Sequence, residues 1–85
     1  MKGIKAIYDN EGASIDRYAV YFSHPKDWGI TQTGIYPNVS MSGAPFHPQG
    51  FCQHGEGMLG QHNGKRIKFE ALPKDCQKAV RRELE

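Results

Sequence analysis

Histidine and cysteine side chains near the middle of the chain are the residues whose types could bind a metal ion. The candidates are His47, Cys52, His54 and His62, which offer the nitrogen and sulfur ligands that suit zinc. Their spacing, His-x₄-Cys-x-His-x₇-His, matches none of the familiar C-x₂-C or H-x₃-H patterns. A zinc-stabilised module or metal-dependent enzyme is therefore one hypothesis, and histidines that hydrogen-bond loop carbonyls are the alternative.

Two other catalytic arrangements are incomplete. Cys52 and His54 would project to the same side of an extended backbone, close enough for a thiolate to form. A thiol nucleophile also needs an orienting group, an oxyanion hole and a cleft, for which 85 residues leave little room. Asp9, Asp16 and Glu56 stand singly in turn-like contexts, where such side chains normally bond their own backbone rather than Mg²⁺. The sequence favours a non-enzymatic protein and implies no cofactor.

Length and composition indicate one domain, residues 1–85, with a small core. A chain of this size buries only about 60% of its unfolded surface. No apolar run approaches the ~20 residues needed to span a bilayer, and the N-terminal Met-Lys-Gly-Ile-Lys lacks the apolar stretch of a signal peptide. Two cysteines in such a chain fit a reducing compartment in which both stay free. We expect a cytoplasmic protein that does not engage a membrane.

The order of elements predicts an α+β fold, a small antiparallel β-sheet of about 4–5 short strands with one C-terminal helix packed on one face. Residues 4–8 and 17–22 are expected to pair as a hairpin, with Tyr18, Val20 and Phe22 on one face of the second strand.

The middle of the chain offers weaker strand signals. A third strand is expected within 34–42, where Pro37 favours an edge or a bulged position. An edge strand can pair with a second copy, so a homodimer is compatible with the sequence. Asn63-Gly64 suits a type I′ turn and predicts a hairpin between residues 58–62 and 65–70.

The C-terminal helix is the clearest element. Pro73 suits the first helical position, and Asp75 in the first turn complements the helix dipole. The apolar stripe comprises Leu72, Cys76, Ala79, Val80 and Leu84, and the cations away from it are Lys74, Lys78, Arg81 and Arg82. Such spacing predicts that the stripe packs on the sheet.

Positive charge is concentrated at this end of the chain. Residues 65–85 carry seven basic and four acidic groups, a net +3, whereas residues 1–64 carry four basic and five acidic groups, a net −1. Basic residues within 65–82 could contact phosphates, so nucleic acid is an alternative partner, although recognisable nucleic-acid motifs are absent. The commoner explanation of this spacing is a solvated helix face.

Residues 43–57 form a glycine-rich segment without periodic pattern, long for a compact domain. We expect an ordered loop, pinned to the sheet by Phe46 and Phe51, because a mobile loop gains nothing from these rings. So small a core cannot bury all the rings of Tyr8, Tyr18, Tyr21, Trp28, Tyr36, Phe46 and Phe51. Exposed rings with arginine and glycine nearby favour protein binding. The alternative is that these rings cover the open face of a thin sheet. The candidate contact residues are Phe46, His47, Phe51, Gln53 and His54, with Arg81 and Arg82 as a charged rim.

Four blocks of sequence carry a resemblance. They are Tyr8-Asp9-Asn10-x-Gly12, Asp16-Arg17-Tyr18-x-Val20, Phe46-His47-Pro48-Gln49-Gly50-Phe51-x-Gln53-His54-Gly55 and Leu72-Pro73-x-Asp75-Cys76-Gln77. In this order the chain resembles a class of small proteins of bacteriophages, prophages and other bacterial mobile elements. No established activity belongs to the class, so no catalytic residue carries over.

The resemblance implies an accessory gene product acting inside a bacterial host cell. Products of that kind often inhibit or modulate host machinery, including defence nucleases of the CRISPR type. Together with the surplus of aromatic rings, this leads to the hypothesis of a non-enzymatic protein that binds a host protein and modulates or inhibits it.

Overall fold

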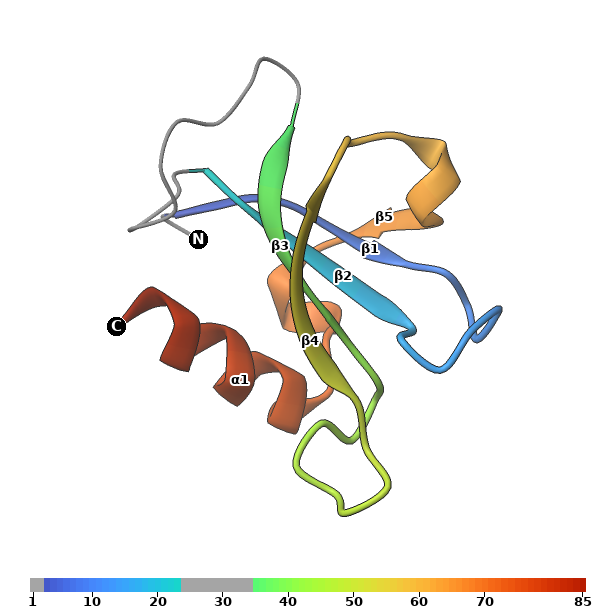
Figure 1. Cartoon of the computed structure of the whole chain (residues 1–85), viewed down its shortest axis with the longest axis vertical. Helices are drawn as coiled ribbons and strands as arrows, with labels where there is room; N and C mark the ends of the chain where they lie inside the picture. The colour runs from blue at the N-terminus through green and yellow to red at the C-terminus, as the bar shows by residue number, and fades with distance from the viewer. Residues whose placement is uncertain (1–2, 24–34) are drawn as a thin grey trace.

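The computed structural model describes residues 3–23 and 35–85 and has the expected α+β architecture, a single antiparallel sheet with a C-terminal helix (Figure 1). The strands are β1 (Ile4–Asp9), β2 (Tyr18–Phe22), β3 (Tyr36–Met41), β4 (Cys52–Gly57) and β5 (Lys65–Ile67). Two 3₁₀ turns, η1 (Gln61–Asn63) and η2 (Phe69–Ala71), precede the helix α1 (Lys74–Leu84). The strand order is β4-β3-β2-β1-β5. Trp28 lies outside the described residues.

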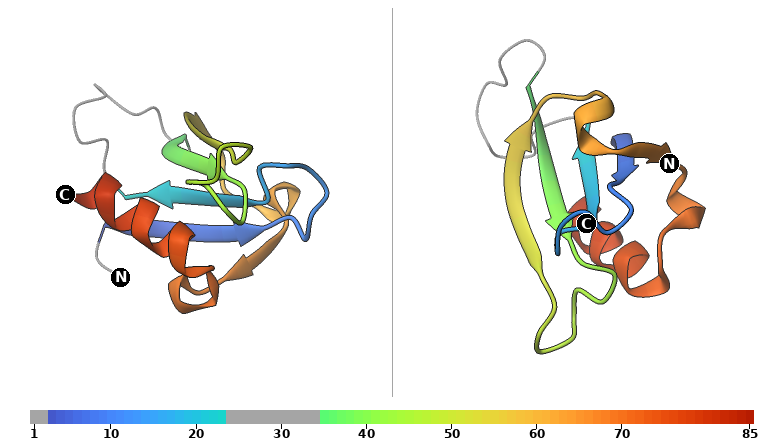
Figure 2. Two further views of the ribbon diagram at one scale, coloured as in Figure 1. Left: turned by 90° about the horizontal axis from the view of Figure 1, so that it is seen from below. Right: turned by 90° about the vertical axis from the view of Figure 1, so that its right-hand side faces the viewer.

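The helix packs on one face of the sheet, as its apolar stripe predicts (Figure 2). The core between them comprises Ile7, Tyr18, Val20, Phe22, Val39, Met41, Leu72, Cys76, Ala79 and Val80. The helix begins one residue later than expected, because Pro73 has an extended ψ of 153° and serves as the N-cap. No helix of the described residues is long and apolar enough to cross a membrane.

The hairpin of β1 and β2 is confirmed, and its two faces are as predicted. Tyr18, Val20 and Phe22 contribute to the core beneath α1. Tyr21 points to the opposite face, where it packs with Ala6 and Tyr8 in a second, smaller cluster. The Tyr8 and Tyr21 rings meet edge to face, with centroids 5.8 Å apart. The sheet therefore buries side chains on both faces near its centre.

The prediction that Pro37 places its strand at an edge is wrong. The strand, β3, lies between β2 and β4. Its ladder with β2 pairs Tyr21 with Asn38 and ends there, while Pro37 lies opposite Glu56 of β4. Proline is tolerated because β3 pairs on one side only at this position.

The prediction that residues 43–57 form a loop without regular structure is half wrong. Residues 43–51 are the connection, but Cys52–Gly57 form the edge strand β4, opposite Tyr36–Met41. Five of the six β4 residues are exposed. The strand therefore lacks the alternation of apolar and polar residues by which a half-buried strand is recognised, and its backbone pairing with β3 defines it.

The predicted hairpin around Asn63-Gly64 is also wrong. A type I′ turn needs positive φ at both central residues, and Gly64 has a φ of 108° whereas Asn63 is not among the residues with positive φ. The chain instead passes from β4 through η1, and β5 pairs with β1 (Figure 1). Asn63 holds this crossing, since its side chain accepts from the Tyr21 hydroxyl at 2.7 Å and donates to the Met58 carbonyl at 2.9 Å.

Gly64 should tolerate a side chain poorly. A Cβ atom there would lie 2.4 Å from the Asp9 carbonyl oxygen, at a φ of 108°. We expect Gly64→Ala to lower the free energy of unfolding by roughly 2–4 kcal/mol, from backbone strain and the clash with β1. Gly12→Ala is the matched control, because its φ is 89° but nothing lies within 4 Å of the added atom. It should cost only about 1 kcal/mol. Urea unfolding measures both, and equal losses would contradict the role of the β1 contact.

Candidate functional site

The Phe46 side chain stands half-exposed beside the basic face of α1. Its side chain belongs to the loop between β3 and β4 and is 46% exposed. The Arg82 guanidinium lies 5.0 Å from the ring centroid and the Lys78 amine 6.0 Å. Such cation–π contacts contribute about 0.5–1 kcal/mol at exposed sites. We call Phe46, Lys78 and Arg82 the Phe46 patch.

The loop that carries Phe46 has a shape maintained by its own backbone. The His47 amide donates to the Ala44 carbonyl at 3.1 Å, and the Gly50 amide donates to the His47 carbonyl at 2.7 Å. A Cβ atom at position 50 would lie 2.1 Å from the Ala44 oxygen, so the turn needs glycine there. Phe51 closes the loop, because its amide donates to the Ser42 hydroxyl at 3.0 Å.

The prediction that both rings pin this loop to the sheet is not supported, because neither ring is among the described side chains that pack against the two core clusters. Phe51 is partly buried where the loop closes on Ser42. Phe46 does not reach the sheet core and contacts α1 instead. The ring remains available because the hydrogen-bonded turns, rather than the Phe46 side chain, define the course of the loop.

A second contact joins β4 to the end of α1. His54 Nε2 lies 2.7 Å from Glu83 Oε1. His54 is opposite Val39, whose side chain belongs to the core beneath the helix, so His54 points to the α1 side of the sheet. The structure thus brings Phe46, His54 and Arg82 of the predicted contact group to one side of the molecule.

The other predicted contact residues lie elsewhere. Arg81 stacks over Phe69 of η2, 5.4 Å from its centroid, on a different flank of α1 from Arg82. Gln53 is opposite Ser40 and helps to line a hollow of about 250 Å³. His47 shapes its own loop, since its Nδ1 atom accepts from the Gln49 amide at 3.1 Å.

The candidate zinc ligands are not brought together. Within residues 3–23 and 35–85, no three His, Cys, Asp or Glu side chains are grouped so that they could hold a metal ion. His47 lies in the loop, Cys52 and His54 in β4, and His62 in η1. The described structure therefore does not support the zinc hypothesis.

The thiols do not have the electrostatic surroundings of a nucleophile. Burial, followed by the charge of Glu83, raises the pKa of Cys52, whereas activation requires a lowered value. Burial raises the pKa of Cys76 to about 11. The Cys76 thiol donates to the Ser42 carbonyl at 3.3 Å, so it joins the helix to the base of the loop. Its role is structural.

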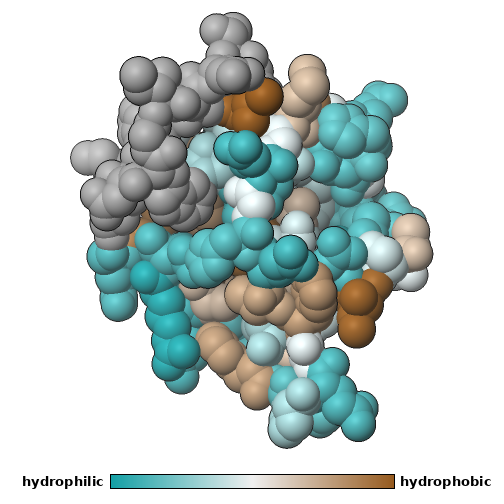
Figure 3. Space-filling model, in the orientation of Figure 1, coloured by the Kyte–Doolittle hydropathy of each residue, from teal (hydrophilic) through white to brown (hydrophobic). Residues whose placement is uncertain are grey.

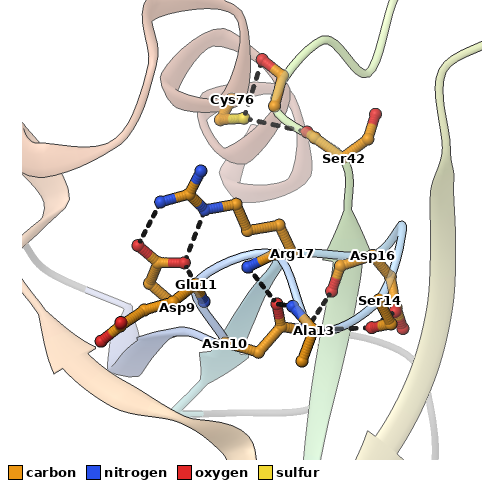
Figure 4. A network of polar contacts seen from close by, with 11 residues as sticks. Asp9, Asn10, Glu11, Ala13, Ser14, Asp16, Arg17, Ser42 and Cys76 are labelled. Carbon is orange, nitrogen blue, oxygen red and sulfur yellow. Dashed lines mark hydrogen bonds and ion pairs between the residues drawn. The ribbon is translucent and has the colours of Figure 1, made fainter.

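The carboxylates of the β1–β2 connection serve the turn, as their context predicts (Figure 4). Asp9 accepts from Arg17 Nε at 2.7 Å and Nη2 at 3.1 Å, and also from the Glu11 amide at 2.7 Å. Asn10 accepts from the Gly12 amide at 3.0 Å. Asp16 accepts from the hydroxyl of Ser14. The Tyr-Asp-Asn-x-Gly and Asp-Arg-Tyr blocks therefore close the hairpin.

Two contributors to the site, Lys78 and Glu83, were not among the predicted contact residues. Lys78 and Arg82 are four residues apart and share a helix face, which the sequence signals. Nothing in the sequence shows that the ring at position 46 reaches that face, or that Glu83 meets β4. The surface that carries β4 has apolar area only in separate small patches (Figure 3).

Asp9→Asn should reduce stability in a pH-dependent way. The hydrogen bond from Arg17 holds the pKa of Asp9 below its ordinary value of 3.8. Because the unfolded chain binds this proton more readily, the contribution of Asp9 is complete above about pH 4 and is lost as pH falls through the lowered folded pKa. Urea unfolding from pH 2 to 7 should show wild type and variant converging at the acidic end. A difference that persists at the lowest pH would contradict this.

The two thiols should differ sharply in reactivity. With a pKa of about 11, Cys76 has a thiolate fraction of only about one in a thousand at pH 8, and it is fully buried. Labelling with a disulfide reagent should modify Cys52 alone in the folded protein, and Cys76 only after unfolding. In Cys52→Ser the fast phase should vanish. A fast phase that survives this substitution would show that Cys76 is accessible.

Comparisons with known proteins do not place this chain in a family. No protein-family model, no curated protein and no solved structure matches it.

Proposed function

We propose that this chain is a small non-enzymatic accessory protein that binds a protein of a bacterial host cell and modulates or inhibits it. The observation that supports this best is the Phe46 patch, in which a hydrogen-bonded loop holds an aromatic ring half-exposed beside two cations of α1. Aromatic and arginine side chains in such positions are typical anchors of protein interfaces.

The energetics of the patch favour binding. A partner that covers the exposed part of the Phe46 ring removes on the order of 100 Å² of apolar surface from water, about 2.5 kcal/mol. The loop turns are already hydrogen-bonded at Ala44, His47 and Gly50, so little conformational entropy is lost on association. Lys78 and Arg82 offer positive charge at the rim, which suits an acidic partner surface.

The proposed setting follows from the resemblance to phage and mobile-element proteins. A product of that kind acts in the host cytoplasm, and a defence nuclease is one class of target. Blocking a surface of the target requires shape and charge alone.

Nucleic acid is the second candidate partner, and one observation favours it. Two hollows of about 380 and 540 Å³ meet at Arg66 on β5, with Lys65 beside one and Lys68 beside the other. These cations lie at the sheet edge opposite β4. Nucleic-acid binding and host-protein binding would therefore use different edges of the sheet.

Photo-crosslinking from position 46 tests the proposal. A benzoylphenylalanine residue in place of Phe46, expressed in bacterial cells, should yield a discrete protein adduct on irradiation. The same residue in place of Phe69, which also lies beneath an arginine, should not. In the position-46 protein, Arg82→Glu should lower the adduct yield at least fivefold, because it reverses the charge at the patch.

Arg81→Glu is the matched control, since it changes net charge equally but lies over Phe69. It should alter the yield less than twofold. Equal losses from both arginine variants, both shown to be folded by circular dichroism, would point to unspecific attraction of an acidic partner. A nucleic-acid adduct, or none, would contradict the proposal.

A further inference from the structure

Strand β4 is an edge strand of the sheet that the structure describes. One side of Cys52–Gly57 pairs with β3, and no strand of the described residues pairs with the other side. Every second residue of such an edge presents an unpaired amide and carbonyl outward, which is a template for another strand.

β4 has few of the features that guard such an edge, and its one acidic side chain is Glu56. Protein edges are commonly protected by lysine, proline, a bulge or a very short strand. β4 has six residues, Cys-Gln-His-Gly-Glu-Gly, without lysine or proline, and it stays in continuous register with β3. Because Gly55 and Gly57 carry no side chain, an approaching backbone is not obstructed there.

The two sides of the edge offer different chemistry. Cys52 and His54 lie opposite Met41 and Val39, which belong to the core beneath α1, so both point to the α1 side. Glu56 points the same way, because side chains of a strand alternate between its two faces. The loop bearing Phe46 leads directly into Cys52, so the Phe46 patch supplies a ring and two cations near that end.

The side away from α1 is polar and open. Asn38, Ser40 and Gln53 are among the residues that line the hollow of about 250 Å³ beside Gly55. Amide and hydroxyl groups of this kind suit a small polar side chain. Asp16 lies in the same hollow and disfavours a carboxylate there.

We infer that β4 accepts an extended acidic segment of the partner protein as an additional strand. Acidic and apolar side chains of that segment would face the Phe46 patch, and small polar ones would face the hollow, in the alternation of a strand. The exposed cations Lys78 and Arg82 stand beside Phe46, on the loop that enters β4 at Cys52, so acidic side chains of the occupant would lie at that end of the edge, away from Glu56. This inference rests on the proposed function and names the recognition mode.

A capped probe peptide, Thr-Glu-Thr-Val-Thr-Glu-Thr-Val, tests the inference by nuclear magnetic resonance on the full chain. Amides of Cys52–Gly57 should become protected from exchange, and shifts should extend to Phe46. Replacing both glutamates of the probe with lysine should weaken binding at least tenfold. Two further probes carry methyl groups on the backbone nitrogens of the odd residues or of the even residues, and their affinities for β4 should differ. One version should lose at least tenfold and the other less than threefold, because only alternate amides pair with β4.

Any of three results would overturn the inference. The two methylated probes could bind equally, the lysine probe could bind as tightly as the glutamate probe, or the β4 amides could remain unprotected at millimolar peptide. The inference would also be overturned by β4 amides protected without peptide together with a dimer in sedimentation, since a second copy would then occupy the edge. If β4 fails this test while crosslinking from position 46 still captures a host protein, the proposed function stands without strand addition. If β4 binds the probe but crosslinking fails, the host-protein proposal is the one that is lost.

Discussion

The packing of α1 on the sheet is the interaction on which the rest of the structure depends. Val20, Val39 and Met41 of the sheet and Cys76 and Val80 of the helix are all fully buried in this contact. Burying each such aliphatic side chain contributes about 1.5–3 kcal/mol. The contact also sets where Lys78, Arg82 and Glu83 stand, so the cations at Phe46 and the carboxylate at His54 follow from it. The surface chemistry of the protein is a consequence of its core.

Most of the polar residues that suggest chemistry are instead used to complete the fold. Asp9 and Arg17 close the first hairpin, and Asn63 holds the crossing between β4 and β5. The buried thiol of Cys76 bonds the carbonyl of Ser42. A short chain can bury little apolar surface. Its loops therefore depend on side-chain hydrogen bonds for a defined conformation.

The proposed recognition surface consists of groups that the fold does not need for its own stability. The Phe46 ring is not needed to define its loop, because backbone turns at His47 and Gly50 do so. β4 contributes its backbone to the sheet while five of its side chains remain exposed. An exposed aromatic ring and an open strand edge carry an aggregation hazard, and their retention side by side is consistent with a binding role.

Local patterns in the sequence determined the hairpin of β1 and β2, the two faces of β2, the helix and the stripe that it buries. These features repeat every two or every three to four residues, so neighbouring side chains reveal them. The tertiary structure alone decided that Cys52–Gly57 is a strand, that the strand containing Pro37 lies between two others, and that β5 returns to β1. It also decided which of Arg81 and Arg82 meets Phe46. Each of these depends on pairing between residues distant in the chain, where no local period exists. An exposed strand with two glycines has no apolar pattern, and its partner strand supplies the order.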